Sequence, residues 1–222
     1  MTFRYYLRAS SRRRFRWLVA QPFIDRNRCL LGAQQEPHQE SRDDEDDRDD
    51  ERGQLEGIYV EPADFADADD LYGRSKYLGE VKGENAVTLR TSIIGHELQG
   101  KLSLVEWFLS QNGSVNGYVN AIYSGFPTIE LARIIDEYVI PDAGLSGLYH
   151  VSSEPVSKYE LLRMIAEIYN KKIDILPYDK FTENKSLDST RFRERTGYVP
   201  PDWRTLVEKM HKWYQRNISM YK

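Results

Sequence analysis

Tyr72 and Lys76 are the residues whose types and spacing could most directly do chemistry. They lie four residues apart in a segment expected to be helical from Asp69 to about Lys82, so both side chains project from one face. The pKa of a phenol is about 10, too high for proton exchange at neutral pH, and a neighbouring ammonium lowers it. The pair could therefore act as a general acid or base, although the 15 tyrosines of the chain make one such spacing expected by chance.

The composition excludes several other kinds of protein. The 222 residues carry a net charge of −4, which gives no reason to expect binding to nucleic acid. No apolar run is long enough to span a membrane. The single cysteine, Cys29, cannot form an internal disulfide, so we expect a cytoplasmic protein in a reducing compartment. We predict no metal site.

The chain divides near residue 52. Residues 1–52 hold 11 arginines and no lysine. The segment begins with a basic head and ends with an acidic run from Asp43 to Glu51. Such dense charge with few apolar residues predicts disorder for this segment. The head could be an unstructured leader, sequence from a wrong reading frame or a fused gene fragment, a targeting peptide, or a nucleic-acid patch.

Residues 53–222 have the pattern of a globular domain in which strands alternate with helices. The buried strand expected at 86–94 is rich in β-branched residues. Ser157 and Glu160 form a capping box, and Asp202 precedes a final amphipathic helix. Further strands are expected at 115–123, 147–151 and 172–176, and further helices at 102–111, 128–138 and 188–195. This alternation predicts an α/β domain.

Five segments, in order, resemble a known family. They are DLYGRSKYLGE (70–80), LRTSIIGHEL (89–98), NAIYSGFPTIELARII (120–135), GLYHVSS (147–153) and SLDSTRFRERTGY (186–198). Together they resemble the C-terminal part of the extended short-chain dehydrogenase/reductases, in particular the dTDP-4-dehydrorhamnose reductase-like group. The resemblance implies an incomplete Rossmann-like α/β domain, its C-terminal half, with a substrate-binding subdomain.

The resemblance also implies roles for individual residues. Tyr72 would protonate a substrate carbonyl oxygen, and Lys76 would hold the cofactor ribose and lower the tyrosine pKa. Ser92 and Ile93 would run past the nicotinamide ring, where ligands bind in open α/β sheets. The residues expected to line a pocket for a nucleotide sugar are Asn120, Ser124 and Arg191.

A glycine-rich turn for the cofactor pyrophosphate is not found anywhere in the sequence. The expected cofactor is NADP or NAD, but the sequence predicts that it binds poorly or not at all. The predicted function is reduction of a nucleotide-linked 4-keto sugar, as in dTDP-rhamnose and polysaccharide biosynthesis. The alternatives are a non-catalytic subunit that binds a sugar nucleotide or regulates a partner, and an inactive, truncated or frameshifted fragment. Unpaired sheet edges would favour a homo-oligomer.

Overall fold

The computed structural model describes residues 4–8, 16–18, 76–81, 86–98, 100 and 102–221. Its first sheet has the strand order β2-β1-β3-β7. β3 (Ala86–Arg90) and β7 (Gly147–His150) are parallel, as expected for neighbouring strands of an α/β sheet. All five residues of β3 are buried, which explains its run of small and β-branched side chains.

The N-terminal strands differ from the expectation of disorder for residues 1–52. β1 (Arg4–Arg8) pairs antiparallel with β3, and β2 (Arg16–Leu18) pairs antiparallel with β1. Tyrosine and leucine favour strands, and the free edge of β3 offers backbone groups for pairing. The acidic run lies outside the described residues.

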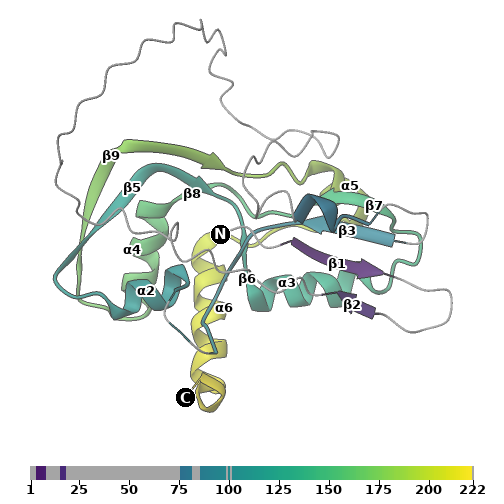
Figure 1. Ribbon diagram of the computed structural model, residues 1–222. Coiled ribbons are helices and arrows are strands. Elements are labelled where there is room, and N and C mark those ends of the chain that lie inside the picture. Colours follow the sequence, from purple (N-terminus) through teal and green to yellow (C-terminus); the bar gives the residue numbers. More distant parts are fainter. Residues whose placement is uncertain are drawn as a thin grey trace, which may run out of the picture.

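The second sheet has the order β8-β5-β9 and is built mainly of two long strands. β5 (Ser114–Tyr123) and β9 (Asp174–Lys185) run parallel and side by side above α2 and α4 (Figure 1). β8 (Val156–Ser157) pairs antiparallel with the end of β5. β9 is longer than the strand predicted at 172–176 and exposes much of its surface, including Leu176 and Phe181.

The strand predicted at 86–94 is divided into two parts. After β3 the chain turns away from the first sheet, and β4 (Ile93–Ile94) pairs in parallel with β6 (Phe126–Pro127). The Phe126 amide donates a hydrogen bond to the Ser92 carbonyl at 2.8 Å. The segment between β3 and β4 is therefore held against the chain that leaves β5.

Two of the described helices, α4 and α6, begin at a residue whose side chain caps the helix. The helices that follow β4 are α2 (Leu104–Ser110), α3 (Thr128–Ile134) continued by the π-helix η1 (Ile135–Val139), α4 (Lys158–Ile168), α5 (Thr190–Thr196), α6 (Trp203–Arg216) and the 3₁₀ helix η2 (Ile218–Tyr221). The capping box of Ser157 and Glu160 is confirmed, and Asp202 accepts from the Thr205 amide at 2.9 Å. The Thr128 hydroxyl donates to the Ile94 carbonyl, and Pro127 holds the N-cap position of α3.

One apolar core joins the two sheets. α6 packs against both α3 and α4, so it lies between the helices that cover the two sheets (Figure 1). Leu89 of β3, Ile165 of α4 and Leu206 of α6 are fully buried members of the same cluster. Of the helices in the described ranges, none is both long and apolar enough to cross a membrane.

His96 links α2, the end of α4 and α6. Its Nδ1 lies 2.5 Å from Glu106 Oε1 and its Nε2 2.9 Å from the Tyr169 hydroxyl. The imidazole stacks on Tyr214 at 3.7 Å between ring centroids. Burial lowers the pKa of His96 below its usual value, although the hydrogen bond and charge of Glu106 oppose this shift.

We expect the stability of the fold to depend on pH through His96. Because its pKa is lower in the folded chain, the unfolded chain binds more protons, and the free energy of unfolding should fall as the pH decreases below about 6.5. Urea unfolding at a series of pH values measures this slope. His96→Gln should reduce the slope in that window, and an unchanged slope would show that other groups, such as His211, cause it.

Candidate functional site

The predicted catalytic pair is described in part. Tyr72 lies outside the described residues. Lys76 begins the described helical residues 76–78, and it is buried with 5% of its surface exposed. A lysine is almost never fully buried unless it is paired. Lys76 and the residues that fix its segment to the sheet therefore define the candidate site.

The segment that follows Lys76 is fixed to the first sheet by a buried ion pair. Glu80 binds Arg90, the last residue of β3, through two hydrogen bonds, Nε–Oε1 at 2.7 Å and Nη2–Oε2 at 3.0 Å. The two side chains are only 5% and 8% exposed. The Thr88 hydroxyl adds contacts at 3.3 Å to the backbone nitrogen and oxygen of Val81.

Arg90 also reaches the neighbouring strand. Its Nη1 lies 3.5 Å from His150 Nε2 on β7, and its carbonyl accepts from the Val151 amide at 2.9 Å. Arg90 and His150 are partners in the parallel register, each at the carboxyl end of its strand. The Lys76 segment is thus tied to the edge of the sheet where ligands bind in open α/β folds.

Buried serines hold three loops together beside this edge. The Ser124 hydroxyl accepts from the Leu187 amide at 2.9 Å, and the Ser124 carbonyl accepts from the Ser153 amide at 2.8 Å. Ser153 Oγ donates to the Gly125 carbonyl at 2.8 Å. Gly125 must be glycine, because a Cβ there would lie 2.3 Å from the Ser92 carbonyl oxygen. Ser92 and Ser124, both predicted for the site, are therefore brought close together by this packing.

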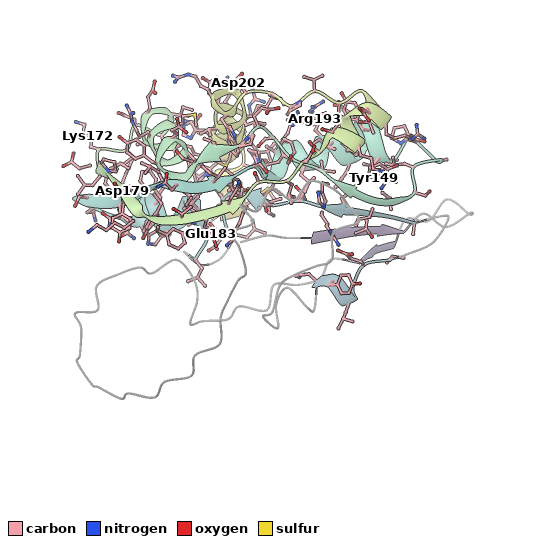
Figure 2. The ribbon with its side chains drawn as sticks, turned by 90° about the horizontal axis from the view of Figure 1, so that it is seen from above. Tyr149, Lys172, Asp179, Glu183, Arg193 and Asp202 are labelled. Carbon is pink, nitrogen blue, oxygen red and sulfur yellow. The ribbon has the colours of Figure 1, made fainter. Side chains whose placement is uncertain are left out.

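The other predicted residues lie at different places. Ile93 is part of β4, directly after Ser92. Asn120 is exposed on β5, and its amide donates to the Asp179 carbonyl on β9 at 3.0 Å, beside the register shift of the two strands. Arg191 is exposed on α5, donates to the Leu148 carbonyl at 3.1 Å and lies over the Tyr149 ring at 4.7 Å. In Figure 2, Tyr149 and Asp179 lie toward opposite ends of the molecule.

Sequence reasoning missed the partnership of Glu80 and Arg90. The sequence does indicate such a partner, because Arg90 is the one charged residue in the strand predicted at 86–94, and a buried guanidinium requires an anion. One cavity of about 380 Å³ lies between η1 and α5, and another of about 600 Å³ lies between α3 and α6. Neither is lined by a residue predicted for the site. Among the residues that the structure describes, no cluster of His, Cys, Asp or Glu could hold a metal ion.

The fold has counterparts among solved structures. One is a dTDP-4-dehydrorhamnose reductase from Bacillus anthracis in complex with NADP, with 23% identity and a TM-score of 0.53, covering 64% of this chain and 54% of that one. Another is a hypothetical dTDP-4-dehydrorhamnose reductase from Sulfolobus tokodaii, with 24% identity and a TM-score of 0.53, covering 67% of this chain and 57% of that one. This chain has the fold of an extended short-chain dehydrogenase/reductase.

The likeness to extended short-chain dehydrogenase/reductases concerns part of each protein. The chain spans little more than half the length of these two structures. No protein-family model and no curated protein sequence matches it. The incomplete Rossmann-like α/β fold expected from the sequence is thus confirmed, and the roles of individual residues stay predictions.

Proposed function

We propose that this chain descends from, and acts as, an NAD(P)-dependent reductase of a nucleotide-linked 4-keto sugar of the dTDP-4-dehydrorhamnose type. The observation that carries the proposal is the buried Lys76, tied through Glu80 and Arg90 to the carboxyl edge of β3 and β7. A buried ammonium at this edge, in this fold, suits the binding of a nicotinamide ribose.

The chain supplies the proton chemistry of the reduction. Tyr72 donates its phenolic proton to the carbonyl oxygen of the sugar, which becomes a hydroxyl. Lys76 favours the phenolate that remains and so brings the tyrosine pKa toward neutrality. The cofactor, when bound, supplies the hydride that adds to the carbonyl carbon. Arg191, exposed on α5, offers a guanidinium for the substrate phosphates.

The residues fit one end of the cofactor better than the other. Lys76 suits the nicotinamide ribose and the Ser92–Ile93 segment suits the nicotinamide ring, but the sequence has no glycine-rich turn to receive the pyrophosphate. This absence favours a second candidate, a non-catalytic protein that binds a sugar nucleotide without the dinucleotide.

Titration of the full chain with NADPH and with NADH separates the two candidates. NADP is the cofactor in the Bacillus anthracis structure, so NADPH is the first to test. A reductase quenches or shifts the cofactor fluorescence on binding and consumes NADPH when dTDP-4-dehydrorhamnose is added. Binding of the dTDP-sugar by calorimetry, with neither cofactor bound nor consumed, would support the non-catalytic candidate and reject the reductase.

A further inference from the structure

We infer that Glu80 and Arg90 are positioning residues, which set the orientation and burial of Lys76 rather than touch substrate or cofactor. The inference rests on the proposed function for what Lys76 does, but its test needs no turnover. Its physical basis is the buried, doubly hydrogen-bonded ion pair that ends the Lys76 segment.

The geometry gives the pair unusual control over this segment. The helical residues end at 78, and the Glu80 amide donates to the Tyr77 carbonyl at 3.0 Å to close the last turn. Two parallel N–H···O bonds fix both the distance and the angle between carboxylate and guanidinium, which a single bond does not. The position of Glu80 therefore determines where the preceding turn, with Lys76, meets the sheet.

Arg90 is itself held on the other side. Its backbone is paired to β7 on one edge and to β1 on the other, and its side chain reaches His150. Arg90 also directly precedes Thr91 and Ser92, which are buried. One guanidinium thus links the Lys76 segment, the strand that leads to Ser92, and the end of β7.

The low exposure of both partners indicates what the ion pair contributes to the structure. A buried ion pair does not by itself favour the folded state over a well-packed apolar pair, but it specifies one geometry. Loss of the carboxylate alone would leave the Arg90 charge buried, so the single change affects the fold as well as the position of Lys76. A double change that removes both charges separates these two effects.

The test measures the reactivity of the Lys76 amine in the folded full-length chain. Lysines are labelled by reductive methylation, and the rate at each lysine is read by peptide mass spectrometry. Glu80→Gln and the double change Glu80→Gln with Arg90→Met should each raise the labelling rate of Lys76 by about tenfold, because local opening then exposes the amine. The labelling rate of Lys171, whose amine donates to the Leu109 carbonyl far from this pair, should stay unchanged.

Two controls make the result decisive. Glu167→Gln breaks the exposed pair with Arg204 and should leave Lys76 labelling unchanged. Thr88→Val removes both contacts of the Thr88 hydroxyl to the backbone of Val81 and should have a smaller effect than loss of the ion pair. A folded double variant with unchanged Lys76 labelling would overturn the inference, and so would a double variant that does not fold, because the pair would then serve the fold as a whole. Failure to bind NADPH would reject the proposed function and leave this result standing.

Discussion

Tyr72→Phe should lower the kcat of NADPH-dependent keto-sugar reduction by about 10²- to 10⁴-fold, the usual contribution of a positioned general acid. The phenyl ring keeps the shape of the side chain and removes only the proton donor. KM and the Kd of NADPH should therefore change little, since the lost interaction matters in the transition state. Stopped-flow or steady-state NADPH consumption measures the effect.

Lys76→Met should affect binding as well as rate. The methionine fills the buried space but cannot hydrogen-bond a ribose or stabilise a phenolate, so both kcat and NADPH affinity should fall.

Tyr77→Phe is the matched control for Tyr72→Phe, because Tyr77 lies next to Lys76 and has no assigned part in the reaction. Equal losses in the Tyr72 and Tyr77 variants would show that the segment tolerates no change and would remove the assignment of Tyr72.

The second large effect concerns stability and involves Glu130 of α3. This carboxylate is 1% exposed and accepts from Arg133 Nη2 at 2.6 Å, Lys209 Nζ at 3.1 Å and the Tyr198 hydroxyl at 3.1 Å. Burial raises its pKa, but the hydrogen bonds and charges of Arg133 and Lys209 outweigh burial and hold the pKa below its usual range. The group therefore joins α3 to α6 as an anion.

The double variant Arg133→Gln with Lys209→Gln should lower the free energy of unfolding by about 3 kcal/mol near neutral pH. This is the low end of the range for breaking a buried ion pair, because both cations are partly exposed. Urea unfolding of the full chain measures it. Arg204→Gln, which breaks only exposed pairs with Glu167 and Glu208, should leave the unfolding midpoint unchanged.

The pH dependence of this difference has a definite sign. In the natural chain the depressed pKa of Glu130 gives stability that is present above its unfolded pKa of about 4.3 and lost as the pH falls through the folded pKa. In the double variant burial dominates, so the carboxyl is protonated more easily and its desolvation penalty disappears at lower pH. The gap in stability should therefore narrow as the pH falls toward 4, and a constant gap would exclude Glu130 as its source.

Local signals in the sequence predicted much of the fold. The capping box at Ser157 and the start of the last helix at Asp202 were predicted correctly, because a side chain and a backbone amide a few residues apart decide them. The full length of β9 was missed, since its second half is exposed and lacks the alternation of a half-buried strand. The break between β3 and β4 was also missed, because the tertiary contact of Ser92 with Phe126 causes it.

The site was less predictable than the fold. The resemblance led to Lys76, but the ion pair of Glu80 and Arg90 forms only when segments ten residues apart meet in the folded chain. Ser124 was expected to line a pocket, which stays a prediction, and the sequence did not indicate that its hydroxyl accepts from the Leu187 amide in the packing of three loops. The ion pair was indicated only by the charged residue Arg90 in a strand predicted to be buried.

The parallel pairing of β5 with β9 has a consequence for the order of folding. Ser114 pairs with Asp174, about 60 residues later, and α3 and α4 lie between the two strands in the sequence. The entropy of closing so long a loop must be lost before the pairing stabilises anything, so contacts of this kind form slowly. During synthesis β5 cannot pair with β9 until β9 has left the ribosome. Until then, the backbone groups along that edge of β5 can pair with other chains. We therefore expect refolding yield to fall steeply with protein concentration.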